Sequence, residues 1–159
     1  MSKVHHYTTT VSWTGNLGTG TRAYEQYSRN HEITAEGKPP LFGSSAPAFR
    51  GDPRGYSPEE LLLSALSGCH MLWYLHLCAK KHIVVTAYGD EATALMEENA
   101  DGSGQFSRVT LHPRVTVTER SMIDEAMLLH DDAHRMCFIA RSVNFPIEHI
   151  AEINCEQQA

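Results

Sequence analysis

The feature that most constrains the fold is one long apolar segment, residues 61–79, which begins directly after Ser57-Pro58-Glu59-Glu60. Serine as N-cap, proline at the first helical position and a second glutamate that closes a capping box form a strong helix start. Three basic residues at 80–82 follow, and cations suit the C-terminal end of a helix. The pattern predicts a helix from Pro58 to about Lys81. Because apolar residues occupy nearly every face, we expect this helix to be buried all round.

A segment of this length must also be considered as a membrane span, because about 20 apolar residues can cross a bilayer. The segment contains two serines, a glycine and two histidines, and the rest of the sequence has the pattern of a small sheet. We therefore expect a core helix of a soluble protein and no membrane partner. A single small sheet cannot cover every face of such a helix, so a second copy of the chain is expected to pack over it as a homodimer.

The other elements follow from strand and turn patterns. Strands are expected at 4–13, 21–29, 31–35, 83–97, 106–119 and 147–155, a proline- and glycine-rich loop at 36–57, a hairpin turn at 99–104, and a second helix at 123–142. The order β-β-β-α-β-β-α-β predicts an α+β fold. It comprises an N-terminal β-meander, a central buried helix, a β-hairpin, a second helix and a last strand, in one domain spanning residues 1–159.

Composition and charge exclude several classes of function. The net charge is −6 and no stretch is rich in lysine and arginine, so a nucleic-acid partner is not expected. Residues 1–13 have no apolar core segment and no cleavage site of a secretory signal, which predicts a cytoplasmic protein. The four cysteines are too few and too scattered for a disulfide framework. In a reducing compartment they are therefore packing residues or reactive thiols.

Two of the four cysteines are candidate reactive residues. Cys69 lies in the middle of the apolar helix beside Gly68, a poor mid-helix residue that lets another backbone or a ligand approach the sulfur. Cys137 belongs to a stripe of small side chains at helical spacing, made of Ala126, Ala133, Cys137 and Ala140. If this stripe crosses at Gly68 and Cys69, the two sulfurs could reach disulfide distance. Cys78 and Cys155 are interpreted as packing residues.

A reactive Cys69 would need a cation nearby, because a thiol in apolar surroundings holds its proton. Arginine keeps its charge when buried, and the candidates are Arg22, Arg29, Arg50 and Arg54. A buried arginine needs a carboxylate partner, for which Glu59 or Glu60 is available. Glu59 lies about 15 Å from Cys69 along a straight helix. A site that uses both must place an arginine between them or take Glu59 from the partner chain.

Two alternatives to thiol chemistry remain open. His130, His134 and Cys137 recur at helical spacing, and His70 adjoins Cys69, so a His/Cys metal site is one of them. However, neither a CxxC pair nor an HExxH motif occurs. The other alternative is a dimer that binds a small apolar ligand without turning it over, in which Cys69 is only part of the pocket wall.

The segment from Tyr56 to Cys69 resembles the Asn-Pro-Glu-Glu-Leu…Cys segment of the OsmC/Ohr family of osmotically inducible and organic hydroperoxide resistance proteins. The late Cys137 matches the second cysteine of that family, and the order of elements agrees over essentially the whole chain. Two departures indicate a divergent branch. Ser57 replaces the family's asparagine, and Phe138 stands after the second cysteine, where family members often have proline.

The resemblance implies an intertwined homodimer of OsmC-like fold, with its sites at the interface. It also implies a cysteine-based peroxidase that reduces organic hydroperoxides, with hydrogen peroxide as a second candidate substrate, a small or protein-bound dithiol as reductant, and no cofactor. By this match Cys69 attacks the peroxide, Cys137 resolves the product as a Cys69–Cys137 disulfide, and Glu59 orients an arginine. We assign that arginine to Arg29, with Arg50 as the second choice.

Overall fold

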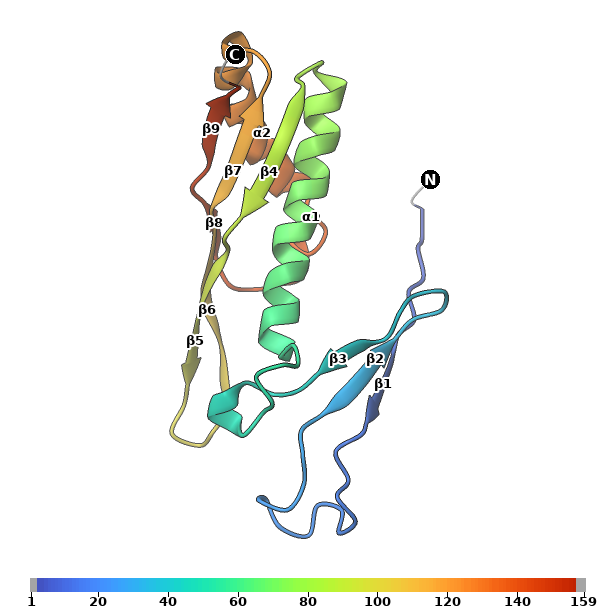
Figure 1. Ribbon diagram of the computed structural model, residues 1–159. Helices are drawn as coiled ribbons and strands as arrows, with labels where there is room; N and C mark the ends of the chain where they lie inside the picture. The colour runs from blue at the N-terminus through green and yellow to red at the C-terminus, as the bar shows by residue number, and fades with distance from the viewer. Residues whose placement is uncertain (1–2, 157–159) are drawn as a thin grey trace. The chain divides into compact units, whose positions relative to one another are not determined.

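The computed structural model describes residues 3–156. It confirms the predicted α+β class (Figure 1). Three strands precede a long helix in the sequence, and further strands and a second helix follow it. The chain divides into two compact units between Leu61 and Leu62, in the first turn of that helix. The single domain over residues 1–159 therefore stays a prediction.

The first unit contains the predicted β-meander. Its antiparallel sheet has the order β1-β2-β3, with β1 at Thr10–Trp13, β2 at His31–Thr34 and β3 at Leu41–Gly43, and the 3-10 turn η1 follows at Pro47–Phe49. The strand predicted at 21–29 is wrong, because that segment forms turns and bends. The guanidinium of Arg29 donates to the carbonyls of Tyr24 and Tyr27, groups that a strand would pair with its neighbour. The third strand lies instead inside the predicted loop 36–57.

Helix α1, Pro58–Lys80, begins and ends close to where the sequence predicts. The backbone N–H of Ser57 donates to Glu60 Oε2 at 2.8 Å, and the N–H of Glu60 donates to Ser57 Oγ at 3.2 Å, which completes the capping box. The helix ends where His82 takes a left-handed conformation with φ 59°. Its amide and that of Ile83 then bond back to the last turn.

Only one line of α1 is buried in the single chain. The buried residues are Leu66, His70, Tyr74 and Cys78, each four positions from the next. Leu72, on another face, is 65% exposed. The chain alone therefore does not bury the helix all round, and another surface is needed to cover its remaining apolar faces. By length and composition α1 would also pass as a membrane span, which is weak evidence because soluble core helices pass the same test.

The second unit contains three long extended segments, each broken once into two strands. The strands are β4 (Val85–Asp90), β5 (Thr93–Glu98), β6 (Gly104–Leu111), β7 (Pro113–Val117), β8 (Ile147–His149) and β9 (Glu152–Cys155), arranged in sheets of order β4-β7-β9 and β5-β6-β8. The sequence predicts the path of all three segments, and Pro113 marks an irregularity in the second of them, but the other two breaks are not predicted. Pro113 has no N–H to donate, and Asp90 Oδ1 accepts the N–H of His112 at 2.7 Å, so the ladder is interrupted there.

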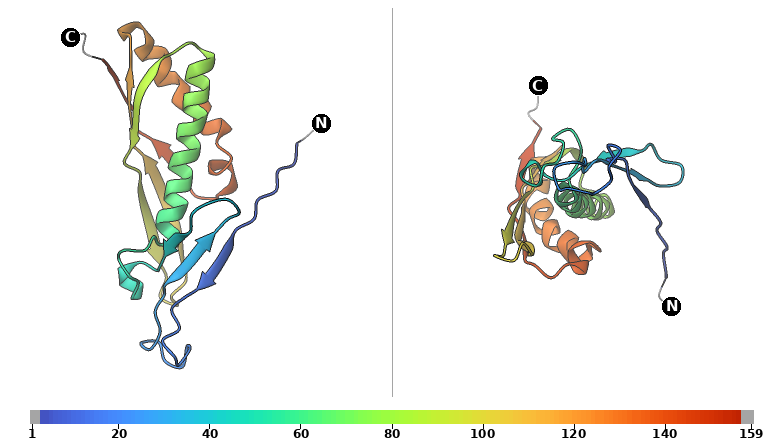
Figure 2. Two further views of the ribbon diagram at one scale, coloured as in Figure 1. Left: turned by 45° about the vertical axis from the view of Figure 1, so that its right-hand side comes forward. Right: turned by 90° about the horizontal axis from the view of Figure 1, so that it is seen from below.

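Helix α2, Ile123–Met136, lies with α1 on one side of the β4-β7-β9 sheet (Figure 2). The 3-10 turns η2 (Arg120–Met122) and η3 (Ala140–Ser142) flank it. Both helices and β7 contribute to one core, whose members include Tyr74, Cys78, Val115, Val117, Ala126, Leu129 and Ala133. The predicted helix 123–142 is too long, because Cys137 leaves the helical conformation with φ −67° and ψ 111°.

Candidate functional site

The structure brings together the two cysteines that the sequence singles out. Cys69 lies on α1 and is half-buried, whereas Cys137 directly follows α2 and is 1% exposed; both are free thiols. Burial, reinforced by the adjacent Cys69 thiol, raises the pKa of Cys137 to about 11, although the N–H of Ala140 donates to its sulfur at 3.4 Å. Cys137 therefore keeps its proton at neutral pH, and Cys69 is the sulfur of the pair that solvent reaches.

The space beside Cys69 is open in the single chain. Beyond its chain neighbours and the backbone of its own helix, a methyl group added at Gly68 would meet no described atom within 4 Å, so the small-residue stripe does not pack closely on Gly68. The stripe itself packs as expected at Ala126, Ala133 and Cys137, all of which are buried. The side chains of Cys69 and Cys137 are therefore in contact although the helices do not cross at Gly68. The space beside Gly68, next to Cys69, stays open.

The two glutamates at the start of α1 have different roles. Glu60 is used in the capping box with Ser57. The Oε2 atom of Glu59 is buried and, within residues 3–156, has no hydrogen-bond partner. An unpaired buried carboxylate oxygen is costly, so this position calls for a donor such as an arginine. The structure thus favours Glu59 over Glu60, a choice that the residues alone leave open.

Arg29 is held in the first unit between two tyrosine rings. Its guanidinium carbon lies 4.2 Å from the ring centroids of both Tyr24 and Tyr27. Its nitrogens donate to the carbonyl oxygens of Tyr27 at 2.6 Å and Tyr24 at 2.8 Å. These contacts orient the guanidinium without neutralising it, since the described part of the chain gives it no carboxylate partner.

The other candidate arginines are less suited to a buried site. Arg54 pairs with Asp52 at 2.6 Å, and the hydrogen bonds from Arg54 lower the pKa of Asp52 to about 2. Arg22 is exposed. Arg50 adopts a left-handed conformation, with its guanidinium carbon 5.8 Å from the Tyr24 ring. Of the four, Arg29 is the one that the structure both fixes and leaves without a counter-ion among residues 3–156.

A buried histidine cluster in the second unit is a feature that the sequence does not predict. His70 Nε2 and His130 Nδ1 form a hydrogen bond of 3.0 Å, and both side chains are fully buried. The ring of His149 lies 5.6 Å from His70 and 5.9 Å from His130, centroid to centroid. The remaining nitrogen of each buried ring has no partner in the described residues. Whichever ring donates, one buried N–H is left unpaired.

The two buried rings of the cluster, His70 and His130, are neutral at pH 7. Burial, and then the neighbouring histidines, lower the pKa of His70 to about 4 and that of His130 to about 3. Within the part of the chain that the structure describes, no three histidine, cysteine, aspartate or glutamate side chains are placed to hold a metal ion. The predicted set of His130, His134 and Cys137 therefore does not form such a site in this arrangement.

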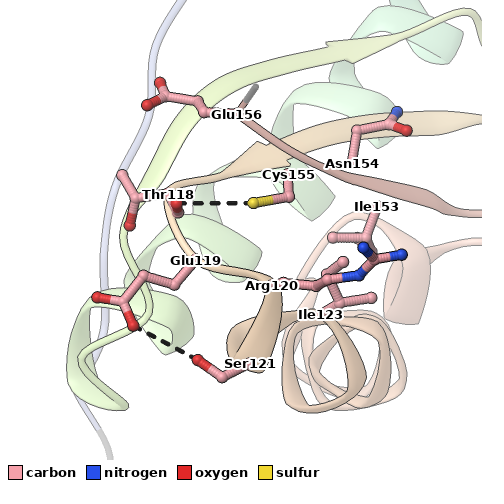
Figure 3. Close-up of a pocket in the computed structure, with 9 residues that line it drawn as sticks. All are labelled: Thr118, Glu119, Arg120, Ser121, Ile123, Ile153, Asn154, Cys155 and Glu156. Atoms are coloured by element: carbon pink, nitrogen blue, oxygen red, sulfur yellow. Dashed lines mark hydrogen bonds between the residues drawn. The ribbon is translucent and has the colours of Figure 1, made fainter. Parts of the chain in front are cut away.

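A wide polar hollow lies elsewhere in the second unit, at the ends of β7 and β9 (Figure 3). Its volume is about 960 Å³, and Cys155 donates there to the carbonyl of Thr118 at 3.6 Å. The hollow contains neither Cys69 nor Cys137. A smaller apolar hollow of about 210 Å³, lined by Leu72, Trp73 and His76, lies on α1 in the turn after Cys69. Of these two hollows, the smaller one is on the same helix as Cys69.

Fold and site together define a small α+β protein with a two-cysteine site. The chain belongs to the OsmC-like protein family, which it matches over residues 51–152. An OsmC-like protein of unknown function from Vibrio cholerae has 29% sequence identity and a TM-score of 0.81, and the match covers 94% of this chain and 100% of that one. The low identity is consistent with a divergent branch.

Two further solved structures share the fold. An organic hydroperoxide resistance protein from Elizabethkingia anophelis, with thiocyanate bound, has 17% identity and a TM-score of 0.69 over 98% of this chain and 100% of that one. An organic hydroperoxide resistance protein OsmC from Legionella pneumophila has 12% identity and a TM-score of 0.64 over 96% and 99%. No curated protein matches the chain.

Proposed function

We propose that the chain is a thiol-dependent peroxidase that reduces organic hydroperoxides, and hydrogen peroxide as a second substrate, with a dithiol as reductant. The observation that carries the proposal is the contact between Cys69, which is partly exposed to solvent, and Cys137, which is buried and protonated. Membership of the OsmC-like family, and the hydroperoxide resistance proteins that share its fold, support the same chemistry. We also propose a cytoplasmic location, where a two-thiol cycle can be kept reduced.

The proposed reaction has two steps and then a reset. The Cys69 thiolate attacks the distal peroxide oxygen, the O–O bond breaks, and the alcohol leaves with a proton while Cys69 becomes a sulfenic acid. Cys137 then displaces the hydroxyl from the Cys69 sulfur, which gives a disulfide and water. A dithiol reductant reopens the disulfide and returns both cysteines to thiols.

The first experiment measures peroxide consumption with a dithiol reductant, together with mass spectrometry of the oxidised protein. We expect Cys69→Ser to abolish turnover and Cys137→Ser to stop after one sulfenic acid, while wild type accumulates the Cys69–Cys137 disulfide. Cys155→Ser is the matched control, because it removes a partly exposed thiol at the far end of β9 and should leave turnover unchanged. Wild type that consumes no peroxide and keeps both thiols reduced would refute the proposal in favour of a ligand-binding dimer.

Arg29 is proposed as the cation for the Cys69 thiolate, with Glu59 as its carboxylate partner. Removing one preorganised electrostatic group from an active site costs about 100-fold in rate. Glu59→Ala is therefore expected to slow peroxide attack by about that factor with little loss of stability. Glu60→Ala is the matched control. It breaks the capping box and should destabilise α1 by about 1 kcal/mol while leaving the rate of attack unchanged. Equal rates in both variants would contradict the assignment.

We further propose that the active form is a homodimer. The single chain buries one line of α1 and leaves large apolar side chains such as Leu72 exposed. An exposed apolar face of this extent is unfavourable in water, and a second copy of the same helix offers a matching surface. Sedimentation of the native protein, which separates monomer from dimer, tests this assignment.

A further inference from the structure

Phe138 occupies the position directly after the buried Cys137. It is 65% exposed, yet its ring meets the ring of Trp73 edge to face, with centroids 5.6 Å apart and an angle of 84° between the planes. This T-shaped arrangement is one that aromatic pairs prefer, because the positive edge of one ring meets the negative face of the other. The contact therefore has a defined geometry in spite of the exposure of Phe138.

Trp73 connects this contact to the other cysteine. It lies four residues after Cys69 on α1, so the two side chains share one face of the helix. Its indole is itself fixed, since it packs against the core and meets His76 edge to face at 5.7 Å. The Phe138–Trp73 contact thus joins the same two segments as the Cys137–Cys69 contact. Phe138 is the residue after Cys137, and Trp73 lies one helical turn after Cys69.

Within residues 3–156, the turn that carries Cys137 is linked to α1 by one hydrogen-bonding contact, the one between the Cys137 and Cys69 thiols. Cys137 leaves the helical conformation, although its N–H still donates to the carbonyl of His134 at 3.3 Å. The other bonds of the turn are internal to it. The N–H of Ala140 donates to the Cys137 sulfur, and Ser142 Oγ donates to the carbonyl of Phe138 at 2.7 Å. These bonds shape the turn, but its placement against α1 depends on side-chain packing.

We propose that Phe138 is a positioning residue for the resolving step, and that it holds Cys137 against Cys69 through Trp73. The inference rests on the proposed peroxidase function. In the resolving step the S–O bond of the Cys69 sulfenic acid breaks, the S–S bond forms, and the Cys137 proton leaves with the hydroxyl as water. Loosening the aromatic contact lets Cys137 drift from the sulfur it must attack, whereas peroxide attack on Cys69 does not involve this turn.

The first test separates the two steps by rapid mixing of reduced protein with cumene hydroperoxide. Phe138→Ala is expected to slow the peroxide-independent step, disulfide formation, about 2- to 10-fold, the factor that matches the strength of an aromatic pair. The peroxide-dependent step should keep its wild-type rate. Phe138→Tyr keeps the ring edge and should restore disulfide formation. Leu128→Ala is the control. It removes an exposed side chain on α2 and should change neither step.

A second test needs no peroxide. The reduced and disulfide forms are equilibrated in a buffer of reduced and oxidised dithiothreitol, and Phe138→Ala should lower the disulfide equilibrium constant by a similar factor, with Phe138→Tyr at the wild-type value. If wild type ignores peroxide but Phe138→Ala still weakens the disulfide, the proposed function fails and the positioning role stands. If Phe138→Ala shows wild-type behaviour in both tests, the positioning role is overturned.

Discussion

Lowering the pH from 7.5 to 5 is expected to destabilise the folded protein by about 4 kcal/mol through His70 and His130 alone. Their pKa values of about 4 and about 3 lie below the ordinary value of 6.5. At pH 5 these two histidines are therefore protonated in the unfolded chain and neutral in the folded chain. The stability from these two rings is fully present above pH 6.5. It is lost as the pH falls from there through about 4 for His70 and about 3 for His130. The titratable groups around the pair are Tyr74, whose ring stacks on His130, and the histidines His134 and His149. The Nε2 atom of His149 lies 3.2 Å from Asp131 Oδ1.

The measurement is urea unfolding of the reduced protein at a series of pH values. His130→Phe keeps a flat ring against Tyr74, whose centroid lies 4.0 Å away, and removes one of the two groups. This variant should lose roughly half of the pH dependence. His76→Gln, which changes an exposed histidine on α1, should keep all of it. A His130→Phe protein with the full loss between pH 7.5 and 5 would show that the buried pair is not the source.

Oxidising Cys69 and Cys137 to a disulfide is expected to stabilise the protein by about 4 kcal/mol. The bridge closes a loop of about 70 residues, and the stabilisation by a disulfide grows with the size of the loop it closes in the unfolded chain. Because the two thiols are already in contact in the reduced protein, closing the bridge requires little movement of the folded backbone. The oxidised form would then be the more stable one.

Urea unfolding of reduced and diamide-oxidised protein at pH 7.5 measures this difference, and diamide makes the result independent of any peroxidase activity. Cys137→Ser is the control, since it cannot form the bridge and should show no gain after the same treatment. An oxidised wild type that is no more stable than the reduced one would mean that the bridge strains the fold. The contact between the two sulfurs would then be less close than the structure has it.

The parts of the fold that the sequence predicts well are those set by local chemistry. The start of α1 depends on Ser57, Pro58 and Glu60, which act within one turn, and its bounds are close to those expected. The contact between the Cys69 and Cys137 side chains is one that small side chains at helical spacing permit and that the family resemblance implies. The strand paths in the second unit follow from alternation of apolar and polar residues.

The parts that it predicts poorly depend on distant contacts. The segment 21–29 has strand-forming residues, but the guanidinium of Arg29 takes carbonyls that a strand would use. The end of α2 at Met136 is not marked by glycine or proline, so periodicity alone extends the helix too far. The histidine cluster joins α1, α2 and β8, and no spacing along the chain places His149 beside His70.

The segment 147–155 has a consequence for how the protein is made. Strands β8 and β9 follow one another in the sequence, yet β8 pairs in parallel with β6 and β9 pairs in parallel with β7. One short stretch therefore forms an edge strand in each of two sheets. Until these residues have been synthesised, β6 and β7 expose open backbone edges next to buried side chains such as Val109 and Val115. The second unit therefore cannot complete either sheet before residues 147–155 have been synthesised. During that interval the open edges of β6 and β7 are most prone to pair with other chains, and a chaperone that binds strand edges would prevent this.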